Sequence, residues 1–292
     1  MWDLSTYLHI PLDLWIQQFV VDWVVPHFRP FFRALQWPIA FLLDKLNAFL
    51  QFVPFPIFCL LACVGLWKLA GRGVAVFSAV ALVFLDLLGL WRDTMTTLAM
   101  ICTAVAFCTV IGLPTGIFAA KNDHASKVLR PTLDVMQTIP SFVYLVPIVM
   151  LFGVGLVPGV IATIIFGLPP IVRLTELGIR QVPADLIEAA LAFGSKPAHI
   201  LRTVEIPLAM PTIMVGLNQT LMMSLSMVVV AALIGAGGLG VTVYTGIGRL
   251  DIGGATLGGI GIVILAIILD RATQALARNP AHKPFEGKVT TN

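Results

Sequence analysis

Charged residues are scarce in this chain. Asp, Glu, Lys and Arg make up 11 % of its 292 residues, against roughly 25 % in soluble globular domains. The mean hydropathy is +0.96, and too little polar sequence remains to solvate a water-exposed surface. The net charge of +3 is too small to indicate nucleic-acid binding. These shortages exclude a soluble domain and favour a membrane protein.

Motifs that carry chemistry are also missing. The four cysteines, Cys59, Cys63, Cys102 and Cys108, form no C-x-x-C pair and lie within apolar runs, so we interpret them as packing residues. The histidines are scattered, and no enzyme constellation is present. Gly194-Ser-Lys196 lacks the upstream glycine of a P-loop, and Gly287-Lys288 is followed by valine. We therefore expect no catalytic residues, metal or cofactor, and any ATP hydrolysis must come from a partner.

One glycine-rich segment fits a nucleotide-binding pattern only superficially. Gly235-Ala-Gly-Gly-Leu-Gly240 matches G-x-G-x-x-G, which requires a preceding strand and an acidic residue about 20 positions later. The apolar run before it begins near Leu208, which is too long for a strand, and Asp251 follows too early. We interpret the segment as a break at the external end of a membrane span.

Long apolar runs are what the sequence does contain. A helix needs about 20 mostly apolar residues to cross a bilayer. Segments of this kind lie at about 52–70, 73–91, 95–119, 139–156, 158–174, 208–234 and 255–273. The sequence therefore predicts an all-α, polytopic membrane protein with about seven spans. Gly254 and Gly258 form a small-xxx-small pair that favours close helix packing in the last span.

The N-terminal region has a different character. It carries four tryptophans among scattered charges, and the stretch from Phe41 to Phe49 has one apolar and one polar face at helical spacing. We expect 1–50 to be an amphipathic interfacial arm. The remaining divisions are two accessory spans at 51–93, a transmembrane core at 94–274 with a loop at 174–207, and a tail at 275–292.

The distribution of basic residues predicts the orientation. One set of loops and ends holds Lys68, Arg72, Lys121, Lys127, Arg130, Arg173, Arg180, Lys196, Arg202, Arg278, Lys283 and Lys288. The other set holds only Arg29, Arg33, Lys45, Arg92 and Arg249. The first set is therefore expected on the cytoplasmic side, with the C-terminus, and the N-terminal arm on the external side.

The longest cytoplasmic loop, from about Arg173 to Pro207, predicts a helix–turn–helix. Asp185 is a good N-cap, and Glu188 three positions later can complete a capping box. Gly194 is expected to end the first helix in the left-handed region. Ser195 can then cap a second short helix that ends before Pro207.

The same loop carries a family resemblance. Glu188, Ala189, Ala190 and Gly194, followed by Val204, Ile206 and Pro207, have the spacing of the EAA loop of ATP-binding-cassette (ABC) importer permeases. Val204 and Ile206 replace the usual isoleucine and leucine, which are conservative changes. The resemblance implies that this loop docks on the ATPase subunit, with Asp185, Glu188, Ala189, Ala190, Gly194, Ile206 and Pro207 as the coupling residues.

Further segments resemble the glycine betaine/proline betaine branch of these permeases. They include 137–147, 167–173, 181–185, 218–219 and 246–251, and the similarity runs from Trp23 to Arg271. The resemblance implies a type I importer fold in the inner (plasma) membrane, a permease homodimer, two ATPase subunits and a separate periplasmic or extracellular solute-binding protein. The solutes would be quaternary ammonium osmolytes such as glycine betaine, proline betaine or choline, and the sequence does not choose among them.

Phe142 and Tyr144 are the candidate pathway residues. They lie in Pro140-Ser-Phe-Val-Tyr-Leu-Val-Pro147, and the two prolines predict a broken helix of the kind tolerated where it lines a cavity. Carbonyl dipoles and aromatic faces can pass a cation without holding it tightly. Tyr144 is favoured because a buried hydroxyl requires a polar or wet neighbour. Alternatively, both rings only pack against helices or lipid.

Two other functional classes would require different sequence features. An ion-coupled secondary transporter of small amines usually holds ionisable groups within the membrane, and the predicted third to sixth spans contain none in their interiors. A membrane scaffold or receptor would leave the helical cytoplasmic loop unexplained. Uptake that requires ATP and resists ionophores would identify the importer.

Overall fold

The computed structural model describes residues 15, 18–19, 22 and 25–277. Within this part of the chain every regular element is helical. In chain order the elements are α2 (Val25–Phe52), α3 (Phe55–Ala70), α4 (Arg72–Leu87), α5 (Trp91–Lys121), α6 (Asp123–Thr138), η3 (Ser141–Tyr144), α7 (Leu145–Phe152), α8 (Leu156–Arg180), α9 (Ala184–Ala192), α10 (Pro197–Ile200), η4 (Leu201–Glu205), α11 (Ile206–Ala231), η5 (Ala232–Ile234), α12 (Leu239–Gly248) and α13 (Ile252–Ala277). The all-α prediction is confirmed.

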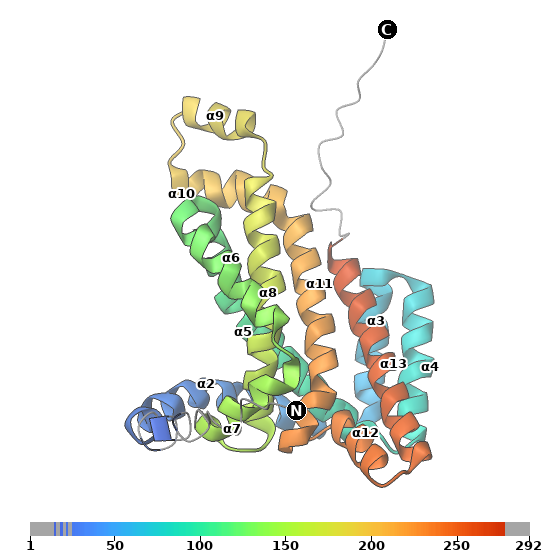
Figure 1. The fold of residues 1–292 in the computed structure, drawn as a ribbon. Helices are drawn as coiled ribbons and strands as arrows, with labels where there is room; N and C mark the ends of the chain where they lie inside the picture. Colours follow the sequence, from blue (N-terminus) through green and yellow to red (C-terminus); the bar gives the residue numbers. More distant parts are fainter. Residues whose placement is uncertain (1–14, 16–17, 20–21, 23–24, 278–292) are drawn as a thin grey trace, which may run out of the picture.

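The helices run between two ends of the molecule (Figure 1). The α9 end holds α9, α10 and the end of α13, and the α12 end holds α2, α7 and α12. The turn between α3 and α4 also lies at the α9 end, because Leu69 and Arg271 line one small cavity there. The described elements that carry basic residues of the two predicted sets thus lie at opposite ends, as the orientation requires. Arg278, Lys283 and Lys288 lie outside the described residues, and the assignment of sides stays a prediction.

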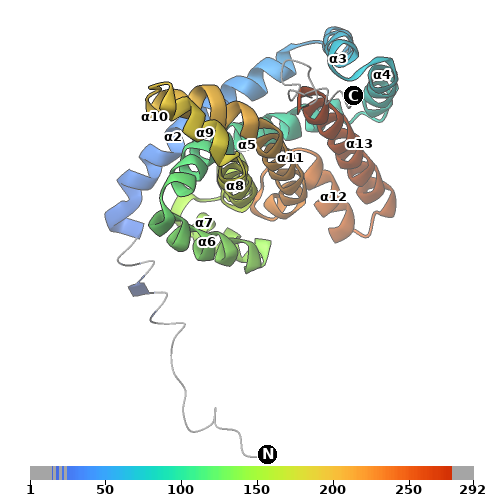
Figure 2. The same cartoon turned by 90° about the horizontal axis from the view of Figure 1, so that it is seen from above.

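Helices α5, α8 and α11 form the centre of the fold, with α8 in the middle when viewed along the bundle (Figure 2). Small residues let these helices approach closely. A Cβ on Gly112 would lie 2.4 Å from Ile171 Cγ2, and one on Gly116 would lie 2.7 Å from the Val172 carbonyl oxygen. The α5–α8 contact therefore depends on a glycine pair four residues apart.

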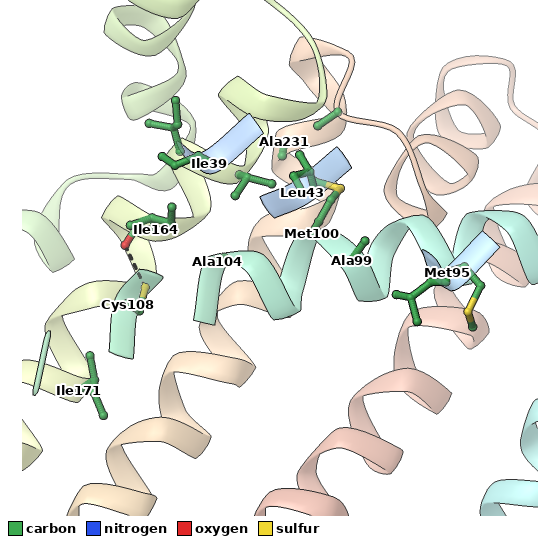
Figure 3. Close-up of a cluster of buried hydrophobic side chains, with 14 of the residues drawn as sticks. Ile39, Leu43, Met95, Ala99, Met100, Ala104, Cys108, Ile164, Ile171 and Ala231 are labelled. Atoms are coloured by element: carbon green, nitrogen blue, oxygen red, sulfur yellow. Dashed lines mark hydrogen bonds between the residues drawn. The ribbon is translucent and has the colours of Figure 1, made fainter. Parts of the chain in front are cut away.

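The buried core continues from this centre onto α2. Leu43 of α2, Met100 of α5 and Val160 of α8 are fully buried in one cluster. Figure 3 shows this packing, with the Cys108 thiol donating to the Ile164 carbonyl oxygen at 3.4 Å. The opposite face of α2 exposes aromatic side chains, including Trp37 at 69 %. Helix α2 is thus amphipathic, and its position in the membrane interface stays a prediction.

The apolar helices differ in detail from the predicted spans. Four helices of the described chain are long and apolar enough to cross a membrane, or up to six if two bent pairs each count as one span. The predicted span at 139–156 is not one helix: α6 and the η3–α7 segment meet at a bend of 103°. Pro140 lies in this break, directly before η3, and Gly153 and Gly155 with positive φ separate α7 from α8.

Residues 123–138, expected within a cytoplasmic loop, form α6 instead. The side chain of Asn122 caps the helix by accepting from the backbone N–H groups of His124 and Ala125. The α6 sequence is amphipathic, so its apolar residues are too dispersed to read as a span. Polar residues of α6 form ion pairs with α8.

The glycine-rich segment is a break, as predicted. Gly235, Gly237 and Gly238 have positive φ and connect η5 to α12. Of the predicted small-xxx-small pair, Gly258 packs within the chain: a Cβ there would lie 2.9 Å from the backbone nitrogen of Val243 in α12. The α12–α13 hairpin is therefore closed by direct backbone contact.

Candidate functional site

A loop of 181–205 extends beyond the bundle at the α9 end, with α9 at its tip (Figure 1). We call it the protruding loop. Three large apolar side chains are exposed on it: Leu186 at 46 %, Leu191 at 50 % and Phe193 at 90 %. Apolar side chains gathered on an exposed helix are typical of a surface that binds another protein.

Gly194 forms the predicted turn after α9. Its φ is +80°, a conformation that glycine adopts without a steric penalty. The Gly194 N–H donates to the Leu191 carbonyl at 2.8 Å, and the Ser195 N–H donates to the Ala190 carbonyl at 3.1 Å. These two bonds satisfy carbonyls at the helix end. The helix–turn–helix prediction is confirmed at this position.

The predicted caps are wrong. Helix α9 starts two residues earlier than expected, with Pro183 as its N-cap in place of Asp185, and no side chain caps it. Pro183 has φ −56° and ψ 129°, so its rigid ring sets the entry to the helix. Asp185 lies in the first turn, where its charge suits the helix dipole. Lys196, not Ser195, precedes α10, again without a side-chain cap.

The second helix of the loop does not end before Pro207. Helix α10 continues through the π-helical η4 into α11, so that Pro197–Ile234 forms one 38-residue span. The Ile206 N–H bonds to the Leu201 carbonyl, five residues back. A π segment widens the helix where the ring of Pro207 would otherwise meet the preceding turn. The proline is thus accommodated inside the helix.

The Glu188, Ala189 and Ala190 segment lies along the protruding helix. Glu188 and Ala189 are exposed, and Ala190 is half-buried. Within the described chain no hydrogen bond or ion pair engages the Glu188 carboxylate. The capping-box role is therefore not found, and this carboxylate is available to a partner protein.

Two buried carboxylates at the base of the loop were missed from the sequence. Glu176, 3 % exposed, accepts from Ser126 at 2.7 Å, from Arg130 at 2.8 Å and from Arg180 at 3.0 Å. Glu205, 1 % exposed, pairs with Lys121 at 2.5 Å. Helix α8 extends beyond the predicted end at 174, which brings Glu176 and Arg180 into the helix. The i, i+4 spacing of these two residues was the available signal.

The candidate pathway residues lie at the break between α6 and α7. The Tyr144 hydroxyl donates to the Met136 carbonyl at 2.6 Å, which satisfies the expected need for a polar neighbour within the chain itself. The Tyr144 ring lines an apolar cavity between α2, α5, α7 and α8 of about 500 Å³. Phe142 is 59 % exposed. The two rings therefore face different surroundings, and their role stays a prediction.

The described residues contain no group of three His, Cys, Asp or Glu side chains that could hold a metal ion. The carboxylates at the loop base are instead engaged by Lys and Arg. The arrangement supports mechanical linkage and protein binding, because the charged groups at the loop base bind one another and the apolar side chains of the protruding loop are exposed.

Comparison with known proteins identifies the relatives of this arrangement. Residues 112–281 match the family described as binding-protein-dependent transport system inner membrane component. The chain is 56 % identical over 270 residues to the glycine betaine/proline betaine transport system permease protein ProW of Escherichia coli, covering 92 % of this chain and 76 % of that protein. It is 44 % identical over 265 residues to the glycine betaine transport system permease protein OpuAB of Bacillus subtilis, covering 91 % and 94 %.

The fold is similar to that of a solved transporter subunit. A chain of the MetNI methionine ABC transporter, in an inward-facing conformation, matches with a TM-score of 0.58 and 26 % sequence identity. The match covers 64 % of this chain and 93 % of that chain.

Proposed function

Because the chain belongs to the family of binding-protein-dependent transport system inner membrane components, we propose that it forms the membrane pathway of an ATP-driven importer for quaternary ammonium osmolytes. The chain is a multi-pass permease subunit of the inner membrane with the type I ABC importer fold. Glycine betaine and proline betaine are the proposed solutes, in line with the names of the relatives that the chain matches over most of its length.

The protruding loop is the observation that carries the proposal. It presents Leu186, Leu191 and Phe193 to the outside, and the Glu188 carboxylate beside them is unengaged. A surface of this kind suits a groove on a separate ATPase subunit, which this chain requires because it contains no P-loop. The proposed coupling residues are Asp185, Glu188, Ala189, Ala190, Gly194, Ile206 and Pro207.

The proposed complex contains two copies of this permease, two ATPase subunits and a solute-binding protein. The binding protein would select the solute, with aromatic rings around the quaternary ammonium group. In the permease, we propose that residues 94–274 form the transmembrane core, that 51–93 are accessory and that α2 rests in the interface. Residues 1–14, 16–17, 20–21 and 23–24 of the proposed arm and 278–292 of the proposed tail lie outside the described residues.

The experiment is uptake of radiolabelled glycine betaine into proteoliposomes that hold the permease, its ATPase and its binding protein. We expect uptake only with ATP on the cytoplasmic side, and no loss of uptake when ionophores collapse proton and sodium gradients. Competition by proline betaine, choline and carnitine then ranks the solutes. Uptake driven by an ion gradient without ATP would contradict the proposal and indicate a secondary transporter.

The secondary transporter has less support in the structure. Its coupling ion would bind a carboxylate with free oxygen atoms inside the membrane. Glu176 is instead held by two arginines and a serine. Asp270 accepts from the side-chain amides of Asn218 at 2.9 Å and Gln274 at 2.8 Å. Glu205 has one oxygen without a partner among the described residues, but its other oxygen is paired with Lys121 at the base of the protruding loop.

A further inference from the structure

The entry of the protruding loop is fixed to the turn between α5 and α6. Arg180 is the last residue of α8. Its guanidinium donates to the Ala119 carbonyl at 2.9 Å and pairs with Asp123 at 2.8 Å. A third bond, to Glu176 at 3.0 Å, orients the group from its own helix. A planar guanidinium with three acceptors has little freedom to turn.

The exit of the loop is fixed to the same turn. Glu205, the last residue of η4, pairs with Lys121 at 2.5 Å. The second carboxylate oxygen, Oε2, is buried and has no hydrogen-bond partner among the described residues. A buried charge is tolerated only with a compensating partner. Lys121 therefore supplies the main compensation, and displacement of Glu205 from it is unfavourable.

Helix α9 has few other supports. Its main contacts are with α10 and η4 of its own loop. A force on α9 therefore reaches the bundle through the two stems. We call the Lys121–Glu205 pair, together with the contacts of Arg180 to Ala119 and Asp123, the stem clamp.

We propose that the stem clamp transmits movement of the protruding loop to the α5–α6 turn, so that α6 moves together with α8 and α11. Lys121, Arg180 and Glu205 are thus positioning residues for coupling. The proposal rests on the proposed function, since the force comes from the ATPase. It also explains how movement of the protruding loop could reach the broken segment that contains Phe142 and Tyr144, because α6 leads directly into η3.

The decisive variant is Glu205→Gln, which keeps the side-chain shape and removes the charge. Lys121, whose side chain is 49 % exposed, can then be hydrated. The matched control is Asp134→Asn, which removes the Arg173–Asp134 pair between α6 and α8 without touching either stem. Lys121→Arg keeps the positive charge beside Glu205, so it tests whether a conservative replacement preserves coupling. The measured quantity is glycine betaine imported per ATP hydrolysed by the complete complex in proteoliposomes.

We expect Glu205→Gln to lower this ratio about fivefold or more, the lower end of the usual range for coupling between two sites. Asp134→Asn and Lys121→Arg should leave the ratio near that of the unmutated complex, and the ATPase subunits should co-purify with every variant. An unchanged ratio in Glu205→Gln, or an equal fall in Glu205→Gln and Asp134→Asn, would overturn the stem clamp.

A second measurement does not depend on transport. Spin labels at His124→Cys and Lys196→Cys, both exposed positions, report the distance between the turn and the loop in a cysteine-free complex. We expect a narrow distribution, unchanged by ATP, that broadens in Glu205→Gln. A distribution that stays narrow in this variant would refute the clamp. Failure of the proposed function would appear separately, as a lack of ATP-dependent uptake by the unmutated complex.

Discussion

Gly194 and Gly116 show that a glycine can be required for two different reasons. At Gly194 the backbone has φ +80°, while a Cβ would have no atom within 4 Å. At Gly116 the backbone is that of an ordinary helix, but a Cβ would lie 2.6 Å from Thr175 Cβ. Gly194 is thus constrained by conformation and Gly116 by packing. Substitution of Gly194 should change the turn alone, whereas substitution of Gly116 should disturb the α5–α8 core.

We predict that Gly194→Val impairs coupling and leaves the bundle folded. A β-branched residue at positive φ costs about 1–2 kcal/mol, so the turn would relax and reorient α9. Solute-stimulated ATPase activity and uptake in proteoliposomes should both fall several-fold. Gly73→Val is the matched control, because Gly73 is exposed, helical and without neighbours within 4 Å. Normal coupling in Gly194→Val would contradict the assignment of the turn.

We predict that Glu188→Ala reduces coupling through the partner and has little effect on the stability of the permease. Its carboxylate is exposed and unengaged, and surface substitutions of this kind usually change stability by less than about 0.5 kcal/mol. ATPase co-purification and solute-stimulated hydrolysis should fall, while the melting temperature stays unchanged. Asp44→Ala, at another exposed carboxylate, serves as the control. If both variants couple normally, Glu188 is not part of the ATPase interface.

At the scale of the elements, the sequence was informative wherever an element is continuous and apolar. The spans at 95–119, 158–174 and 255–273 correspond to parts of α5, α8 and α13, and the span at 208–234 corresponds to most of α11 together with η5. Composition did not predict where the helices end, because polar residues at the helix ends are bound by partners that are distant in the sequence. The extension of α8 to Arg180 depends on Asp123, Arg130 and Ser126 of α6, which no local pattern reveals.

In the candidate site, too, some features could be predicted from the sequence and others could not. Gly194 was predictable because a local backbone requirement determines it. The starts of α9 and α10 were not predictable, because the fixed geometry of Pro183 and Pro197 sets them and no side chain caps either helix. The π segment before Pro207 was equally hidden, since it results from the fit of the ring within a long helix.

We predict opposite sides for the protruding loop and the α12–α13 turn. In a cysteine-free background, Arg249→Cys should react with a membrane-impermeant maleimide in intact cells. Ser195→Cys should react only after permeabilisation. The reason is the Lys/Arg asymmetry between the two ends. Labelling of Ser195→Cys from outside would reverse the orientation.

We predict different effects for the two aromatic residues of η3. Tyr144→Phe removes the hydroxyl bond to the Met136 carbonyl and should lower stability by about 1 kcal/mol, because an acceptor loses its donor. Phe142→Leu changes an exposed ring and should alter the uptake rate or solute preference, with assembly and basal ATPase activity intact. Unchanged transport in Phe142→Leu and Tyr144→Leu would mean that both rings only pack.

At the scale of the whole molecule, one face of α11 exposes polar side chains. Val215, Gln219 and Ser226 are exposed at helical spacing on a helix that is otherwise packed in the bundle. The face of α4 is different, with Val76, Val80 and Val83 exposed and apolar. Polar side chains within a span normally face protein or water and not lipid. The α11 face is therefore the better candidate for contact with a second copy or with the solute pathway between copies.

We predict that Gln219→Cys and Ser226→Cys each cross-link two permeases in the assembled complex. In a dimer with twofold symmetry, a residue close to the axis lies next to its own copy, so a single cysteine is sufficient. A short bismaleimide added to the cysteine-free complex in membranes should give a covalent dimer for both variants. Val80→Cys on α4, 65 % exposed, is the control and should remain monomeric on denaturing gels. Dimers formed by Val80→Cys but not by the α11 variants would place the interface on α4, and the polar face of α11 would then require a different partner.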